Sequence, residues 1–173
     1  MIQPSDLFFT KLRPTATIPQ KRLEDVGYDV YADFEEDFIV IYPHKIAKIP
    51  TGIASAFHHS KGIILKERGS TGTINMTQKS GVIDSGYRGE WFIPIANDND
   101  TTLIISKLGE QETLRRAFGE IAPSDIIFYP YHKAIAQAVV IDVPVMNVAE
   151  VSKETLKSFG SERGSGALGS SGK

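Results

Sequence analysis

The segment from Gly81 to Trp91, GVIDSGYRGEW, combines a carboxylate and an aromatic ring with three glycines. Asp84 offers a carboxylate, which is a competent general base at neutral pH. The glycines permit tight reversals and close approach of the backbone to a ligand. We expect a β-hairpin with Asp84 and Tyr87 near its tip, and the spacing alone is equally compatible with an ordinary Asp-Ser-Gly turn.

Four further segments carry charged or polar side chains among small residues. They are GYDV at 27–30, RGSTG at 68–72, AIAQ at 134–137 and RGSGALGSSG at 163–172. The planar guanidinium of arginine, present in two of them, matches phosphate oxygens better than a point charge does. Taken singly, each segment is also typical of a turn with an exposed ion pair. The literal GxGxxG at 164–169 is not expected to bind a dinucleotide, because that fingerprint works only between a strand and a helix.

Residue usage excludes several other kinds of chemistry. The chain has no cysteine, so disulfides, cysteine-ligated zinc, iron–sulfur clusters and thiol nucleophiles are ruled out. Its four histidines show neither HxH nor HExxH spacing, so we expect no histidine-ligated metal. The net charge of −2 gives no general attraction to nucleic acid or acidic membranes. The longest apolar run, Phe38–Tyr42, is too short to cross a bilayer, and the N-terminus lacks the pattern of a signal peptide. We therefore expect a soluble, cytoplasmic protein.

The elements that must position these side chains are expected to be strands. Short runs of Val, Ile, Phe and Tyr recur between turn residues, which predicts an all-β fold, and 173 residues favour one domain. The expected strands cover residues 25–33, 38–42, 45–49, 62–66, 91–96, 102–106, 126–129 and 135–140. One segment, Glu110–Phe118, has helix-forming residues with Leu114 and Phe118 four apart. It predicts a short helix within an excursion from Asp98 to Asp125.

The composition changes at Gly160, after which nine of the last fourteen residues are Gly or Ser. Such a composition is typical of a flexible arm. We therefore expect a β domain over residues 1–159 and a C-terminal arm over 160–173. Arg163 and Lys173, placed among glycines and serines, could close over a phosphate once it is bound.

In their order and wording, the five segments resemble the five motifs of the trimeric dUTP diphosphatases (dUTPases). The resemblance runs from about Asp25 to the C-terminus, with residues 98–125 as an insertion between the third and fourth motifs. It implies a jelly-roll-like β-barrel and a homotrimer with active sites built between subunits. The implied reaction is Mg²⁺-dependent hydrolysis of dUTP to dUMP and pyrophosphate.

The third motif carries the implied catalytic and nucleoside-binding groups. Asp84 resembles the general base that orients water for attack on the α-phosphorus, and Tyr87 resembles the residue beneath the deoxyribose that excludes a 2′-hydroxyl. Gln78 stands where the family usually has an asparagine facing the base. The backbone groups expected to read the uracil edge belong to Gly81, Val82 and Ile83.

The first, second and fourth motifs imply contacts with phosphate and metal. Arg68 resembles the phosphate-binding arginine. Gly69 occupies the place of the usual serine and Ser70 follows it, so either a backbone N–H or a hydroxyl would meet the bridging oxygen. Asp29 and Gln137 resemble residues that contact only the waters of a Mg²⁺ ion, which the triphosphate itself holds.

The arm resembles the fifth motif with one departure. Arg163 resembles the ligand of the γ-phosphate, with Gly169, Ser170 and Ser171 near the positions of the remaining phosphate contacts. Leu168 stands where the family normally places a phenylalanine stacked on the uracil.

Two alternative functions are also compatible with the resemblance. A dCTP deaminase of the same fold would need a catalytic glutamate where Pro94 stands, and proline cannot exchange a proton. A dUTP-responsive regulatory protein would bind a protein partner through the 98–125 insertion.

Overall fold

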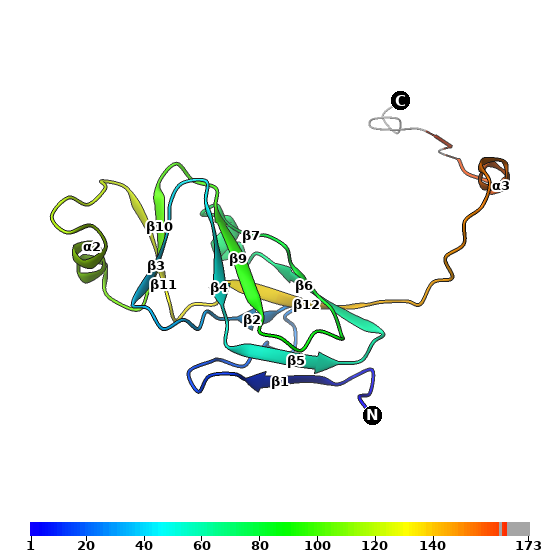
Figure 1. Cartoon of the computed structure of the whole chain (residues 1–173), viewed down its shortest axis with the longest axis horizontal. Coiled ribbons are helices and arrows are strands. Elements are labelled where there is room, and N and C mark those ends of the chain that lie inside the picture. Colours follow the sequence, from blue (N-terminus) through cyan, green and yellow to red (C-terminus); the bar gives the residue numbers. More distant parts are fainter. Residues whose placement is uncertain (163, 166–173) are drawn as a thin grey trace. The chain divides into compact units, whose positions relative to one another are not determined.

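The computed structural model describes residues 1–162 and 164–165, and strands dominate it (Figure 1). The strands are β1 Leu7–Lys11, β2 Tyr28–Val30, β3 Phe38–Ile41, β4 Ile46–Pro50, β5 Ile53–Phe57, β6 Lys61–Lys66, β7 Met76–Gln78, β8 Val82–Ile83, β9 Phe92–Asn97, β10 Thr102–Ser106, β11 Ile126–Pro130 and β12 Ala136–Asp142. The helices are α1 Gly69–Gly72, α2 Glu110–Phe118 and α3 Lys153–Ser158. The predicted all-β class and the predicted helix α2 are confirmed.

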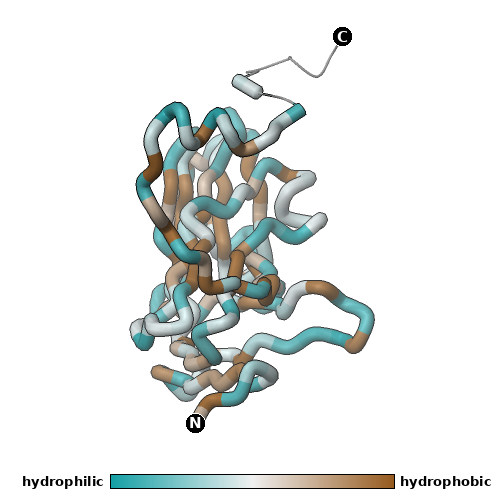
Figure 2. Tube along the Cα trace, turned by 90° about the vertical axis from the view of Figure 1, so that its right-hand side faces the viewer, coloured by the Kyte–Doolittle hydropathy of each residue, from teal (hydrophilic) through white to brown (hydrophobic). Residues whose placement is uncertain are grey.

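The strands pair into four small sheets with mostly antiparallel neighbours. Their orders are β1-β5, β11-β10-β3, β2-β12-β6-β8 and β4-β9-β7. Apolar positions concentrate along these strands (Figure 2), and the core that they enclose includes Trp91, Ile93, Leu103 and Ile105. Each strand is too short to bury a core alone, so the fold depends on these layers packing together.

The segment 98–125 divides into a core strand and a surface crossover. All five residues of β10 are buried, and β10 pairs in parallel with β11. Helix α2 lies on the connection between these two strands, where the hydroxyls of Ser106 and Thr113 are 2.7 Å apart. Residues 98–101 and 107–125 of this segment therefore lie outside the strands.

The expected hairpin around Asp84 does not form. Strand β8 pairs with β6, whereas β9 pairs with β4 and β7. Ile83 enters the core opposite Ile63, which commits β8 to the β6 edge. A turn follows, closed by the Tyr87 N–H donating to the Asp84 carbonyl at 3.1 Å. The simpler reading as an Asp-Ser-Gly turn is the one that holds.

The chain divides into two compact units, Met1–Val143 and Pro144–Lys173. Helix α3 belongs to the second unit, and Ser152 caps its N-terminus by accepting a hydrogen bond from the Thr155 N–H at 3.1 Å. The boundary expected after residue 159 rested on composition and stays a prediction. Within the described residues, no helix has the length and apolar character needed to cross a membrane.

Candidate functional site

Strand register brings the first and fourth motifs together. Gln137 on β12 lies opposite Asp29 on β2 and, on its other side, opposite Lys66 on β6. Its amide Nε2 donates to the Glu67 carbonyl at 2.7 Å. A Cβ atom at Gly27 would lie 2.8 Å from Gln137 Oε1. Position 27 therefore needs a glycine, because the backbone of the first motif passes close to the Gln137 side chain.

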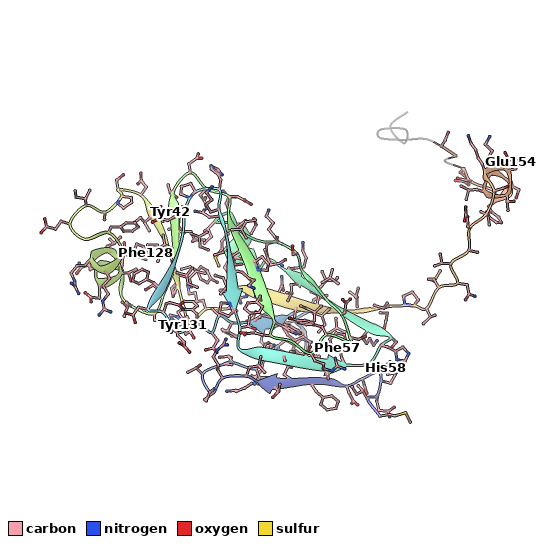
Figure 3. The ribbon with its side chains drawn as sticks, viewed as in Figure 1. Tyr42, Phe57, His58, Phe128, Tyr131 and Glu154 are labelled. Carbon is pink, nitrogen blue, oxygen red and sulfur yellow. The ribbon has the colours of Figure 1, made fainter. Side chains whose placement is uncertain are left out.

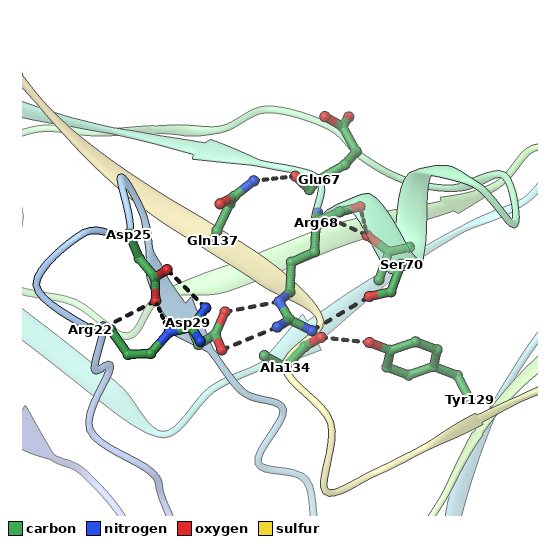
Figure 4. Close-up of polar contacts among 10 residues, drawn as sticks. Arg22, Asp25, Asp29, Glu67, Arg68, Ser70, Tyr129, Ala134 and Gln137 are labelled. Carbon is green, nitrogen blue, oxygen red and sulfur yellow. Dashed lines mark hydrogen bonds and ion pairs between the residues drawn. The ribbon is translucent and has the colours of Figure 1, made fainter.

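The second motif delivers a guanidinium to the same place. Arg68 Nε donates to Asp29 Oδ1 at 2.8 Å and Nη2 donates to Oδ2 at 3.2 Å (Figure 4). The turn of α1 follows directly, and the Arg68 N–H donates to the hydroxyl of buried Thr71 at 3.0 Å. This turn also places Ser70 Oγ 3.5 Å from Arg68 Nη1. Both charged side chains remain about one-third exposed, so a ligand can reach them.

Tyr129 lies beside this group and was missed by the sequence reasoning. Its hydroxyl donates to the Ala134 carbonyl at 2.6 Å, next to Arg68 and Ser70 (Figure 4). Burial raises the pKa of Tyr129, and the neighbouring Ser70 and Arg68 act in the opposite direction. The phenol of Tyr129 therefore stays protonated and uncharged at neutral pH. The only signal for it was a tyrosine on an expected strand.

The Asp29–Arg68 pair lies in an open cleft of about 1070 Å³. Its lining includes the predicted residues Asp29, Arg68, Gly69, Ser70 and Gln137. A loop that the sequence reasoning did not single out, Lys21–Val26, forms another part of the wall. The volume and the paired charges suit a polar, phosphorylated ligand of nucleotide size.

The third motif lies away from this cleft within one chain. Ile83 pairs with Ile63 near the start of β6, whereas Gln137 pairs with Lys66 at its end. At about 3.3 Å per residue, Asp84 and Gln137 are about 13 Å apart along the strand. The carboxylate of Asp84 is exposed and is not among the residues that line this cleft.

The turn before β8 is built around Gln78 and Gly81. The backbone of Ser80 has φ of 53°, and the buried Gln78 amide donates to the neighbouring Lys79 carbonyl. A Cβ at Gly81 would lie 2.5 Å from the Leu65 carbonyl oxygen and 2.9 Å from Gln78 Oε1. Glycine is thus required there, and its carbonyl accepts a hydrogen bond from the Leu65 N–H at 2.6 Å.

Tyr87 presents an exposed ring on the turn after Asp84. Its side chain is 43% exposed, and its hydroxyl donates to the Glu90 carbonyl at 2.9 Å. A Cβ at Gly89 would meet that hydroxyl at 2.5 Å, which explains the glycine. The ring is therefore held in place while one face remains open.

An ion-pair network anchors the end of the third motif. Arg13 Nη2 donates to Glu90 Oε1 at 2.6 Å and its Nε donates to Asp33 Oδ2 at 2.7 Å. The Gly52 N–H also donates to Glu90 Oε1, at 2.8 Å. Tyr131 (Figure 3) donates to the other oxygen of Asp33 at 3.3 Å. Sequence reasoning missed this network, because its members are far apart along the chain.

The charges in this network shift the pKa values of its members. Hydrogen bonding to Glu90 is the main cause that raises the pKa of Arg13. Burial alone would raise the pKa of Glu90, but the hydrogen bonds from Arg13 and Gly52 and the Arg13 charge outweigh it and lower that pKa. Glu90 is therefore a carboxylate throughout the neutral range.

The remaining predicted positions fall into two groups. Pro94 lies within β9 opposite Lys48, and it offers no ionisable group. The arm residues Arg163, Leu168, Gly169, Ser170 and Ser171 lie outside the described residues.

The cleft offers few ligands for a metal. Among residues 1–162 and 164–165, no three His, Asp or Glu side chains gather closely enough to hold an ion. The donor set near Arg68 is one carboxylate, Asp29, and one amide, Gln137. Such a set fits a hydrated Mg²⁺ ion held mainly by phosphate oxygens of a ligand.

Comparison with known sequences places most of these motifs in one family. A family model described as dUTPase matches residues 13–109. A deoxyuridine 5′-triphosphate nucleotidohydrolase of Leptospira interrogans is 33% identical over 103 residues, covering 57% of this chain and 70% of the relative. The enzyme of that name from Picosynechococcus is 28% identical over 166 residues, covering 94% and 95% of the two chains.

Comparison with solved structures concerns the fold. The dUTPase of Staphylococcus bacteriophage 80alpha with dUPNHPP superposes with a TM-score of 0.72 at 21% identity, covering 98% of this chain and 99% of the phage chain. The likeness confirms the jelly-roll-like β fold expected from the sequence.

Proposed function

The chain belongs to the dUTPase family of nucleotide hydrolases, and from this premise we propose that it hydrolyses dUTP to dUMP and pyrophosphate. The observation that carries the proposal is the convergence of Asp29, Arg68 with Ser70, and Gln137 on one open cleft. A cleft that pairs a forked cation with a carboxylate and an amide suits a metal-bound triphosphate.

In the proposed reaction, Asp84 acts as the general base. Its carboxylate accepts a proton from water as that water attacks the α-phosphorus, and pyrophosphate leaves. Arg68 and Ser70 hold the phosphate chain and fix its orientation, so that water approaches the α-phosphorus from one direction only. Bound Mg²⁺ would neutralise part of the phosphate charge, with Asp29 and Gln137 contacting its waters.

The nucleoside end of the substrate is assigned to the third motif. The backbone of Gly81, Val82 and Ile83 would pair with the uracil edge, and the Gln78 amide lies close enough to Gly81 to join that contact. The open face of Tyr87 would pack beneath the deoxyribose and leave no room for a 2′-hydroxyl. Arg163, Leu168, Gly169, Ser170 and Ser171 would close over the bound nucleotide.

We also infer that complete sites form between subunits of a homotrimer. Asp84 and Gln137 are offset by about 13 Å along β6 and lie on opposite sides of that strand, which supports this arrangement. The exposed side chain of Val82 beside Asp84 offers apolar surface that a second chain could cover.

The test is a substrate panel with product identification. The protein is incubated with dUTP, dCTP, UTP and dTTP in the presence of Mg²⁺, and nucleotide and phosphate products are separated. Release of dUMP and pyrophosphate from dUTP alone supports the proposal. Formation of dUTP from dCTP would instead establish a deaminase, and tight dUTP binding without any product would establish a regulatory reader.

A further inference from the structure

The loop Lys21–Val26 lines the cleft but has no part in the proposed reaction. It is internally ordered, because Lys21 Nζ donates to the Asp25 carbonyl at 2.8 Å and to the Arg22 carbonyl at 3.2 Å. The base of the loop is tied to β2, where the Asp29 N–H donates to the Gln20 carbonyl at 2.8 Å. Lys21 is thus occupied by backbone carbonyls, and Arg22 is the remaining cation of the loop.

Arg22 forms a forked pair with Asp25 at the edge of the cleft. Its Nε donates to Asp25 Oδ2 and its Nη2 donates to Oδ1, both at 3.0 Å (Figure 4). The Arg22 side chain is nevertheless 89% exposed. A guanidinium has five N–H donors, and Asp25 takes two of them. The other donors face solvent and remain available to an anionic ligand.

The pair belongs to an alternating row of charges across the cleft. Arg68 forms an ion pair with Asp29. The Arg22–Asp25 pair is also near enough to Asp29 for the Asp29 charge to act on Arg22. Hydrogen bonding to Asp25 is the main cause that raises the pKa of Arg22, and the charge of Asp29 adds to it. In sequence across the cleft, the charges are therefore Asp25, Arg22, Asp29 and Arg68 (Figure 4).

Asp25 also orders the loop by accepting a hydrogen bond from the Arg22 backbone N–H at 3.1 Å, and this bond does not depend on the Arg22 side chain. An exposed pair three residues apart contributes little to folding, because water screens it and two long side chains lose freedom. The cations Lys21, Arg22 and Arg68 balance the anions Glu24, Asp25 and Asp29 along the described lining. A triphosphate entering a balanced cleft gains most from a guanidinium that its carboxylate can release at low cost.

We propose that Arg22 is a second phosphate-binding guanidinium, which pairs with Asp25 in the empty cleft and with the phosphate chain in the occupied one. The inference rests on the proposed function, since it assumes that the cleft holds the triphosphate of a nucleotide. Asp25 then competes with phosphate for the Arg22 guanidinium. It pairs with Arg22 in the empty cleft and is displaced when phosphate binds.

The test compares binding of three probes by titration calorimetry in Mg²⁺: dUpNHpp, inorganic triphosphate and dUMP. Arg22→Gln should weaken binding of dUpNHpp and inorganic triphosphate by about tenfold to a hundredfold, the range for losing hydrogen bonds to a charged group. It should leave dUMP within about twofold, because the distal phosphates are absent. Arg22→Lys should recover only part of the loss, because an ammonium keeps the charge without the fork.

The matched control is Arg115→Gln on α2. Arg115 is also exposed and also pairs with a carboxylate three residues away, Glu112, but outside the cleft. This control should bind all three probes like the wild type. Equal weakening of dUMP and triphosphate in Arg22→Gln would indicate general damage to the cleft and overturn the proposal, as would unchanged triphosphate binding.

Competition by Asp25 is tested separately. Asp25→Asn should tighten inorganic triphosphate by more than Glu24→Gln, which removes the same charge from the same wall without freeing Arg22. Weaker binding in Asp25→Asn would show that the pair is structural and overturn the proposal. Wild-type protein that binds inorganic triphosphate but not dUpNHpp would contradict the proposed function while leaving the Arg22 comparison intact.

Discussion

Asp84 and Gln137 lie towards opposite ends of strand β6, one following its neighbour β8 and the other on its neighbour β12. The proposed general base and the proposed phosphate-binding cleft of one chain therefore lie apart. If a complete site takes Asp84 from one subunit and Arg68 from another, two inactive variants with substitutions in different halves of the site can together form an active site.

Coexpression of Asp84→Asn chains with Arg68→Ala chains is expected to restore activity. Each variant alone should be inactive, whereas random mixing gives sites with both residues intact in about one quarter of cases. Activity is measured on purified mixed oligomers, with separately purified variants combined just before the assay as the control. Mixed oligomers as inactive as the parents would place both residues in one chain's site.

Asp84→Asn should separate binding from catalysis. The amide keeps the size of the side chain but cannot accept the proton, so turnover should fall by about 10²–10⁴-fold while dUpNHpp still binds. Asp100→Asn, an exposed aspartate paired with His44, serves as the control. Turnover close to that of the wild type would remove Asp84 from the role of base.

The sugar specificity should depend on Tyr87. UTP is expected to be a much poorer substrate than dUTP, because the ring leaves no space for the 2′-hydroxyl. Tyr87→Ala should narrow the ratio of the two kcat/KM values, whereas Tyr42→Ala, another exposed tyrosine, should not. Equal values for dUTP and UTP in the wild type would contradict this role.

Glu90 should contribute to stability in a pH-dependent manner. Its pKa is lower in the folded chain, so its contribution is complete above the unfolded value of about 4.3 and is lost as pH falls through the folded value. Glu90→Gln should therefore cost about 1–3 kcal/mol at neutral pH and progressively less below about pH 4.

Urea unfolding between pH 3 and 7 measures the Glu90 effect, with Glu36→Gln, an exposed acid, as the control. A loss of stability in Glu90→Gln that is the same at pH 3 and pH 7 would show that the carboxylate charge is not what stabilises the network.

Leu168→Phe is expected to tighten binding of dUpNHpp by about threefold to tenfold. Stacking of an aromatic ring on a base contributes roughly 1–3 kcal/mol, of which an aliphatic side chain supplies only part by van der Waals contact. Some of the gain goes into ordering the arm. Calorimetry on intact oligomers tests this, and unchanged affinity would mean that residue 168 does not cover the uracil.

The parts of the fold that the sequence predicted correctly have strong local patterns. Strand β10 contains the apolar run Leu-Ile-Ile, and α2 joins good helix formers with an apolar pair four apart. By contrast, α1 consists of Gly-Ser-Thr-Gly, whose intrinsic helix propensity is poor, and it forms because Thr71 is buried and bonded to Arg68. Strand β8 has only two residues and is defined by its partner β6.

The candidate site likewise combines residues that local sequence patterns predict with residues that only tertiary packing brings into place. Asp29, Arg68 and Gln137 could be singled out because each stands in a recognisable segment, and strand register then brings them together. The contact between Arg13 and Glu90 joins residues 77 positions apart, and no local sequence pattern predicts such a pair. Tyr129 was likewise hidden, since its position beside Arg68 follows from tertiary packing alone.

The parallel pairing of β10 with β11 limits how the chain length between them can change. A connection between parallel strands must return along the full length of the pair, which takes a dozen or more residues, whereas a two-residue turn serves only antiparallel strands. Residues near the exposed Ile121 can thus accept added length, but excision of 107–125 would unpair β11. Because β11 carries Tyr129 to its place beside Arg68 and Ser70, a deletion in this crossover would also remove the support that Tyr129 gives to these two residues.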